Sequence, residues 1–100
     1  MSTIKKVAVI GTGVIGTGWI IRCLAHGKIV YAFDRDIKLK KNLIVEIKRT
    51  WPYVKKLFKK KKLNLNNFIF LTSIEETLKH ADLIQECATE NYALKTKLMN

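Results

Sequence analysis

A glycine-rich segment near the amino terminus has the spacing of a phosphate-binding turn. It has the pattern Gly-x-Gly-x-x-Gly and consists of Gly11, Thr12, Gly13, Val14, Ile15 and Gly16. The first glycine permits a tight turn, the second lets the backbone approach a diphosphate, and the third permits close packing of the following helix. Free N–H groups and a partial positive charge at the start of that helix favour phosphate. The pattern predicts a dinucleotide site, with a purely structural turn as the alternative.

A carboxylate follows at the position expected of a ribose ligand. Asp34 lies 18 residues after Gly16 and directly follows the β-rich run Ile29–Phe33. An acid at this place can accept hydrogen bonds from both hydroxyls of an adenosine ribose, whereas a 2′-phosphate would meet like charge. NAD is therefore favoured over NADP, although Arg35 next in the chain offers a phosphate ligand. The alternative for Asp34 is capping of the following helix, together with Asp36.

The other residues capable of chemistry favour structural roles. His26 and His80 each lie at the end of a predicted helix, and Cys23 falls on the apolar stripe of the first helix. Cys87 ends a predicted strand near the expected cofactor cleft, but no base adjoins it to activate the thiol. No metal-ligand cluster or nucleophile triad can be assembled. Two cysteines without a Cys-x-x-Cys pair predict a reduced, cytoplasmic setting.

The elements that must position these residues alternate between strand and helix. Short apolar runs predict strands at 7–10, Ile29–Phe33, Phe68–Leu71 and 83–87. Helical spacing predicts helices at about 15–26, 37–60, 74–80 and 92–100. Gly27 is a suitable left-handed stop for the first helix. Ser73, with Glu76 three residues later, fits the capping box of a short helix.

The second predicted helix carries one apolar stripe opposite its lysines. The stripe consists of Leu43, Ile47, Trp51, Val54 and Phe58. Pro52 interrupts it, and a proline inside a helix removes a hydrogen bond and clashes with the preceding turn. We therefore expect a kink, or two helices that meet near Trp51.

The order of elements predicts an α/β fold with a Rossmann-like parallel sheet and helices on both faces. About four strands in the order 3-2-1-4 correspond to the first half of a doubly wound dinucleotide fold plus one strand, so the predicted sheet is incomplete. The chain of 100 residues is predicted to be one NAD-binding domain, 1–100, without internal repeats or linkers.

Positive charge is concentrated in one segment. The chain has a net charge of +11, and residues 38–62 contain eleven basic residues and a single acid, Glu46. A solvated helix face is the first interpretation of the lysines at 55–62. The second is non-specific binding of a polyanion, although no RNA-recognition aromatic signature accompanies the run. We expect no specific nucleic-acid partner.

No membrane partner is expected. The longest apolar stretch, at 7–25, contains four glycines and the charged Arg22, whereas a transmembrane helix needs about 20 largely apolar residues. A signal peptide is the alternative, because two lysines precede this stretch.

Several segments resemble one known family. They are KVAVIGTGVIGTGW at 6–19, AHG at 25–27 and FD at 33–34. Together they resemble the NAD-binding domain of L-3-hydroxyacyl-CoA dehydrogenases. The likeness is greatest to the branch that oxidises L-carnitine, because of TWP at 50–52 and ADLIQE at 81–86, and it extends over essentially all 100 residues.

The resemblance implies NAD as cofactor and two further contacts with it. The family's segment E-x-x-x-E-x-x-x-x-K places its second acid and its lysine beside NAD, and these positions correspond to Glu90 and Lys95. The implied reaction is hydride transfer between NAD and the hydroxyl carbon of a small 3-hydroxy acid derivative, namely L-carnitine to 3-dehydrocarnitine.

The family's catalytic histidine and glutamate, and the helical domain that forms its homodimer, follow the region matched here. The resemblance therefore implies an amino-terminal fragment that is inactive alone. Cys87 and Thr89 depart from the serine and proline of the carnitine branch. Two alternatives stay open: a 3-hydroxyacyl-CoA dehydrogenase of fatty-acid oxidation, and a non-catalytic basic module that binds nucleotide or nucleic acid.

Overall fold

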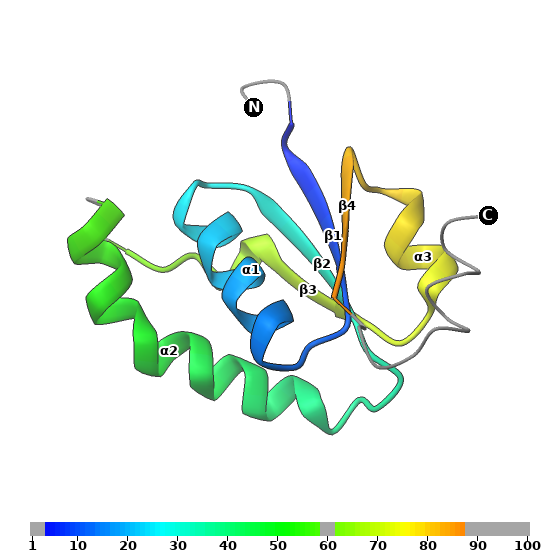
Figure 1. Cartoon of the computed structure of the whole chain (residues 1–100), viewed down its shortest axis with the longest axis horizontal. Helices are drawn as coiled ribbons and strands as arrows, with labels where there is room; N and C mark the ends of the chain where they lie inside the picture. Colours follow the sequence, from blue (N-terminus) through cyan, green and yellow to red (C-terminus); the bar gives the residue numbers. More distant parts are fainter. Residues whose placement is uncertain (1–3, 59–61, 88–100) are drawn as a thin grey trace.

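Four parallel strands form one sheet in the part of the chain that the structure describes, residues 4–58 and 62–87 of a computed structural model. The strands are β1 (Lys6–Ile10), β2 (Ile29–Phe33), β3 (Phe68–Leu71) and β4 (Leu83–Glu86). Their spatial order is β3-β2-β1-β4 (Figure 1), and each pair of neighbours is parallel. The expected α/β class and the order 3-2-1-4 are therefore confirmed.

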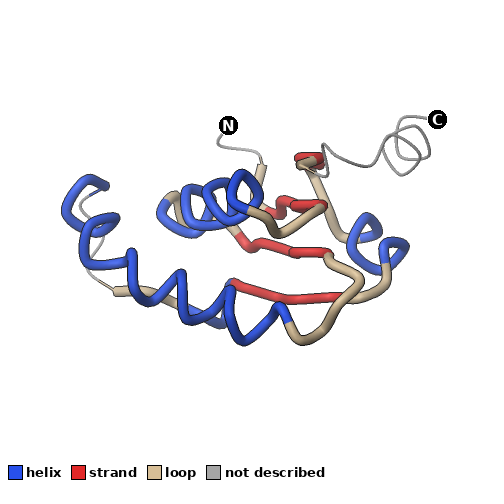
Figure 2. Tube along the Cα trace, turned by 60° about the horizontal axis from the view of Figure 1, so that its bottom comes forward, coloured by secondary structure: helices blue, strands red, loops and turns tan. Residues whose placement is uncertain are grey.

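The helices lie on both faces of this sheet. α1 (Val14–Ala25) and α2 (Leu39–Phe58) cover one face, and the short α3 (Ile74–Lys79) lies against the other (Figures 1 and 2). The larger core lies between the sheet and the first two helices and includes Val7, Val9, Ile20, Leu24, Val30, Ile47 and Phe70. A smaller core on the side of α3 contains Ala8, Ile10 and Phe33, packed against Ile74, Leu78 and Ala81.

β1 is buried on both faces because helices cover each side of the sheet at this strand. Val7 and Val9 belong to the larger core, and Ala8 and Ile10 to the smaller one. All four side chains are at most 1% exposed. An unbroken apolar run is what a strand covered on both sides requires, and β1 ends directly at the glycine turn.

α2 is one helix, so of the two alternatives for Pro52 the pair of separate helices is wrong, and the kink stays a prediction. It continues from Leu39 to Phe58 with Pro52 inside. Pro52 has no N–H to donate to the carbonyl of Lys48, but both residues are exposed, so water can bind that carbonyl. Trp51 before the proline and Val54 after it belong to the same core cluster. Packing therefore holds both halves against one sheet.

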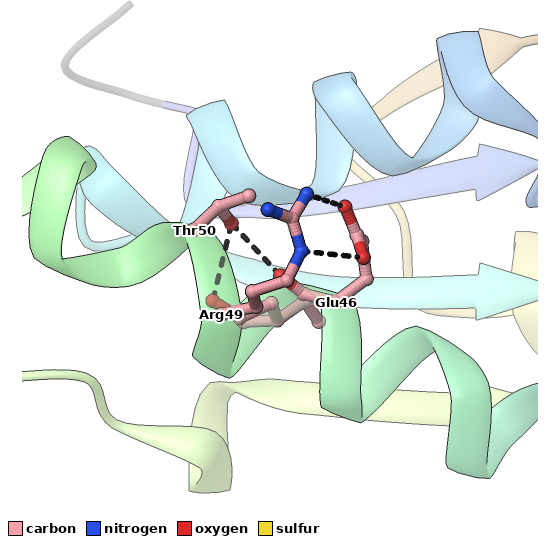
Figure 3. Close-up of polar contacts among 4 residues, drawn as sticks. Glu46, Arg49 and Thr50 are labelled. Carbon is pink, nitrogen blue, oxygen red and sulfur yellow. Dashed lines mark hydrogen bonds and ion pairs between the residues drawn. The ribbon is translucent and has the colours of Figure 1, made fainter.

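Polar side chains on α2 make local contacts. Arg49 donates to the carboxylate of Glu46, with Nε 3.1 Å from Oε2, and Thr50 Oγ1 donates to the carbonyls of Glu46 and Ile47 (Figure 3). The lysines of the helix are exposed; they are Lys40, Lys41, Lys48, Lys55 and Lys56. This exposure agrees with a solvated helix face.

Local capping explains where the shorter helices begin and end. Gly27 has φ 75°, and the N–H groups of Gly27 and Lys28 bond back to the carbonyls of Leu24 and Cys23, each at 3.0 Å. This arrangement is a Schellman stop and confirms the role predicted for the glycine. At the start of α3, Ser73 Oγ accepts the N–H three residues later at 3.3 Å, as the capping box predicts.

The remaining expectations are resolved where the structure describes them. β4 ends at Glu86, one residue before the predicted end. The helix expected at 92–100 lies outside the described residues. None of the described helices combines the length and apolar character that a membrane span requires.

Candidate functional site

The carboxyl ends of the four strands meet at one edge of the sheet, and the predicted site residues follow them. Backbone bonds extend the ladder past the strands: Gly11 N–H donates to the carbonyl of Phe33 at 3.0 Å, and Cys87 N–H donates to that of Ile10 at 2.8 Å. Asp34 N–H similarly donates to Leu71 at 3.3 Å. In open α/β sheets, ligands bind at this edge, where the strand order reverses. Here the reversal lies between β1 and β4.

The first and third glycines of the turn are required by its shape. Gly11 has φ 95°, a left-handed conformation that a side chain disfavours. A β-carbon at Gly16 would lie 1.9 Å from the carbonyl oxygen of Gly11. The first turn of α1 therefore touches the backbone where β1 ends, and no larger residue fits there.

The second glycine faces open space. A β-carbon built on Gly13 meets nothing within 4 Å. Gly13 is also the N-cap of α1, and as a glycine it has no side chain that could accept the free N–H groups of the helix. The first turn contains no acidic residue. α1 thus begins without a side-chain cap from its N-cap residue, and its first N–H groups and the positive end of its dipole suit a diphosphate.

Asp34 lies beside the glycine turn, although the two are distant in sequence. Its Oδ2 accepts a hydrogen bond from Thr12 Oγ1 at 2.8 Å and lies 3.4 Å from the N–H of the same residue. Its Oδ1 accepts the N–H of Asp36 at 3.3 Å. The structure therefore brings together the predicted phosphate turn and the predicted ribose ligand.

The hydrogen bond nearest the start of α2 is made by Asp36 and not by Asp34. Asp36 Oδ1 accepts the N–H of Lys38 at 2.9 Å, just before α2 begins. Asp34 is half-buried against the turn, whereas Arg35 and Asp36 are exposed. Asp36 therefore bonds to the backbone just before α2, and Asp34 Oδ2 bonds to Thr12 in the glycine turn.

Burial is the largest influence on the pKa of both cysteine thiols and outweighs the neighbours that would activate them. Cys23 is buried in the larger core, as expected, and burial raises the pKa of its thiol. Burial, and then the charge of Glu86, raise the pKa of the Cys87 thiol. Neither thiol is therefore a ready nucleophile near neutral pH.

The histidines pack against neighbouring rings. His26 Nδ1 lies 2.9 Å from the carbonyl of Arg22, and its ring meets Phe58 edge-on at 5.1 Å. His80 stacks on Tyr31 with 5.0 Å between the ring centres. No group of three metal-ligating side chains occurs in the described segments.

Two predicted site residues lie outside the described residues, and one contact in the site was not predicted from the sequence. Glu90 and Lys95 fall beyond residue 87, the last one described. Thr12 was expected to contribute as part of the turn, but nothing in the sequence predicted that its hydroxyl bonds to Asp34. The contact joins residues 22 positions apart, and only the register of β1 on β2 brings them together.

The fold and the site together define a dinucleotide-binding α/β domain. More narrowly, the chain belongs to the family 3-hydroxyacyl-CoA dehydrogenase, NAD binding domain, which it matches over residues 6–100. Because this family is an NAD-binding domain, the match confirms NAD as the cofactor expected from the sequence.

Relatives and solved structures agree with this membership. The chain is 50% identical over 91 residues to L-carnitine dehydrogenase of Oceanobacillus iheyensis, covering 91% of this chain and 30% of that protein. It is 38% identical to L-carnitine dehydrogenase of Staphylococcus epidermidis, covering 94% and 29%. The structure of (S)-3-hydroxybutyryl-CoA dehydrogenase from Ralstonia eutropha superposes with TM-score 0.79 at 26% identity, covering 97% of this chain and 35% of that one. The chain thus spans about 30% of the length of these curated relatives.

Proposed function

We propose that residues 1–100 are the NAD-binding part of a dehydrogenase and that the glycine turn with Asp34 forms the cofactor site. The observation that carries this proposal is the uncapped start of α1 in front of the open space at Gly13, with the carboxylate of Asp34 beside it. The proposed ligands in the turn are the backbones of Gly11, Thr12, Gly13, Val14, Ile15 and Gly16.

The residues present fit the cofactor by shape and charge. Unsatisfied N–H groups suit the diphosphate, and Asp34 suits the ribose hydroxyls while opposing a 2′-phosphate. Val14 and Ile15 at the mouth of the turn are 92% and 58% exposed, so they offer apolar surface beside it. When bound, NAD supplies the hydride acceptor, and this part of the chain supplies orientation.

Glu90 and Lys95 complete the proposed cofactor contacts. Their support is the resemblance of the segment after β4 to the family's cofactor-binding pattern. The proposed reaction is oxidation of the hydroxyl carbon of a small 3-hydroxy acid derivative. L-Carnitine is the first candidate, because the Oceanobacillus relative is an L-carnitine dehydrogenase and is 50% identical in this region.

A 3-hydroxyacyl-CoA substrate is the second candidate. It is favoured by the family and by the superposition on a 3-hydroxybutyryl-CoA dehydrogenase. Exposed lysines at the end of α2, Lys55 and Lys56, offer charge to coenzyme A phosphates. Assay of the full-length gene product with L-carnitine and with acetoacetyl-CoA separates the two, since activity is expected with only one.

The proposal also covers the cellular location and the assembly of the whole protein. Two free cysteines, Cys23 and Cys87, support a cytoplasmic location. The family resemblance supports a homodimer formed through a carboxyl-terminal helical domain. We propose neither a specific nucleic-acid partner nor a membrane partner.

Titration of the chain with NAD by calorimetry tests the cofactor site. We expect weak binding that Asp34→Ala reduces by about ten- to a hundredfold, because the variant removes hydrogen bonds to a charged acceptor. Asp36→Ala is the matched control, since that carboxylate caps the approach to α2, and it should bind NAD like the wild type. Unchanged affinity in Asp34→Ala would exclude the ribose assignment.

An activity assay tests the claim that this region is only the cofactor half. The 100-residue chain should show no turnover with L-carnitine or a 3-hydroxyacyl-CoA. Steady NADH formation by the purified chain would refute this claim, but it would not contradict the proposed cofactor site.

A further inference from the structure

Thr12 makes a side-chain contact that a phosphate-binding turn does not require. Its hydroxyl donates to Asp34 Oδ2 at 2.8 Å, and its N–H lies 3.4 Å from the same oxygen. The other contacts of a diphosphate turn involve backbone, so any small residue would serve at this position. A hydroxyl bonded to a carboxylate is among the stronger hydrogen bonds in proteins.

The threonine is itself held in place. Its carbonyl accepts the hydroxyl of Thr17 at 3.2 Å, which ties it to the first turns of α1. The preceding residue, Gly11, is anchored to β2 through the carbonyl of Phe33. The backbone of Thr12 is therefore held in place on both sides, and the hydrogen bond from its hydroxyl limits the rotation of the Asp34 carboxylate.

The contacts leave the carboxylate able to bind a ribose. An ionised carboxylate has about four lone-pair sites. In the described residues, Thr12 donates two hydrogen bonds to Oδ2, through its hydroxyl at 2.8 Å and its N–H at 3.4 Å, and the N–H of Asp36 donates one to Oδ1 at 3.3 Å. These contacts leave one site on Oδ1 for a ribose hydroxyl, and the long hydrogen bond from the Thr12 N–H is the one that a second ribose hydroxyl can replace on Oδ2.

We propose that Thr12 is a positioning residue that holds Asp34 in the orientation that selects NAD over NADP. This inference rests on the proposed cofactor site. Without the hydroxyl, the carboxylate must lose rotational freedom when the ribose binds, and it can also turn away from a 2′-phosphate. Loss of the hydroxyl should therefore weaken NAD binding and relax discrimination against NADP.

Calorimetric titration of wild type and Thr12→Val with NAD and with NADP tests the proposal. Valine keeps the shape and removes the hydroxyl. NAD affinity should fall about three- to tenfold, the range expected when one side chain must be newly immobilised. NADP affinity should fall less or rise, so the ratio of the two dissociation constants narrows. An unchanged ratio would overturn the proposal.

Two companion variants separate positioning from packing. Thr12→Ser keeps the hydroxyl and should restore both affinities, whereas equal impairment of Ser and Val would assign the effect to the lost methyl and overturn the proposal. Thr50→Val is the matched control, because within the described residues the Thr50 hydroxyl bonds to carbonyls of its own helix (Figure 3). It should leave both affinities unchanged.

A double-mutant cycle with Asp34→Ala shows whether Thr12 acts through the carboxylate. Thr12→Val should change NAD affinity in the wild-type background and leave it unchanged in the Asp34→Ala background. An equal loss in both backgrounds would overturn the inference. If Thr12→Val fails to fold by circular dichroism, Thr12→Ala takes its place in the same cycle. Failure of the wild type to bind NAD would instead overturn the proposed function.

Discussion

Individual residues define the proposed site through one close approach and one hydrogen bond. Gly16 lets α1 meet the backbone at the end of β1, and Thr12 joins the turn to Asp34. Both contacts lie within a few residues of the open space at Gly13. The turn is therefore closely packed at Gly16, whereas a β-carbon built at Gly13, where a diphosphate would lie, meets no atom within 4 Å.

Gly16→Ala and Gly18→Ala should have opposite effects, although both glycines lie in α1. The added methyl at Gly16 would lie 1.9 Å from a backbone oxygen, so the turn must shift and the free energy of unfolding should fall by about 2 kcal/mol or more. A methyl at Gly18 meets nothing within 4 Å. It should raise the free energy of unfolding by about 0.5–1 kcal/mol, because alanine favours a helix over glycine.

Urea unfolding followed by circular dichroism measures both effects. NAD titration of Gly16→Ala should show loss of binding, since the turn has moved. Equal stability of the two variants would contradict the close approach at Gly16.

At the scale of elements, a single carboxylate links the starts of β1 and β4. Asp82 Oδ2 accepts the N–H groups of Lys5 and Lys6, each at 3.0 Å. These two hydrogen bonds, together with nearby lysine charge, lower the pKa of Asp82 below its usual value. Because the folded pKa is lowered, the ionised carboxylate stabilises the fold above the pKa of the unfolded chain. This contribution is lost as pH falls through the folded pKa.

Asp82→Asn should therefore lower the free energy of unfolding near neutral pH and lower it less at acidic pH. The difference in urea midpoint between wild type and variant should be largest near neutral pH and should shrink as the pH falls below the usual pKa of an aspartate, because the wild-type carboxylate then becomes protonated. If the difference in urea midpoint stays constant with pH, the charge of Asp82 is not the cause of the stabilisation.

Trp51 on α2 is a core residue with an unmet polar group. Its side chain is 7% exposed, and its indole N–H has no hydrogen-bond acceptor among the described residues. A buried donor without a partner costs about 1–3 kcal/mol, which offsets part of the gain from packing. The residue therefore stabilises the protein by volume and not by its polar atom.

Trp51→Phe should change the free energy of unfolding by less than about 1 kcal/mol, because removal of the unmet N–H compensates for the smaller ring. Trp51→Ala should cost about 3–5 kcal/mol through the cavity that it leaves. Thermal and urea unfolding of the two variants check this. A loss in Trp51→Phe as large as that in Trp51→Ala would contradict the expected compensation from removal of the unmet N–H.

The whole molecule combines a strong positive charge with an edge strand, β4, that has exposed apolar side chains. The net charge is +11, and much of it lies on and just after α2. β4 forms one edge of the described sheet, where Leu83 and Ile84 are 36% and 49% exposed. Mutual repulsion and exposed apolar surface both oppose stability, so we expect marginal folding of the isolated chain.

Salt should stabilise the chain, since it screens repulsion among the lysines. The unfolding temperature should rise between about 0.05 and 0.5 M KCl at constant pH. Lys48→Glu, on the exposed side of α2, should raise the unfolding temperature at low salt and reduce its dependence on salt. A fall in unfolding temperature with added KCl would show that favourable ion pairs outweigh the repulsion.

The sequence by itself determined the strands, their order and the position of the turn. Apolar runs, glycine spacing and caps such as Ser73 act within a few residues, so the linear pattern already contains their physical causes. The family motifs extended this prediction to the cofactor. The position of Asp34 after β2 was also predictable, because parallel strands bring their carboxyl ends to one edge.

Tertiary structure decided what depends on neighbours distant in the chain. Packing against one core carries α2 through Pro52, where local propensity predicted an interruption. Strand register places Thr12 against Asp34 and Asp82 against the start of β1, across 22 and up to 77 positions of sequence. Such contacts follow from the assembled sheet, because no local pattern encodes which side chains meet when its strands align.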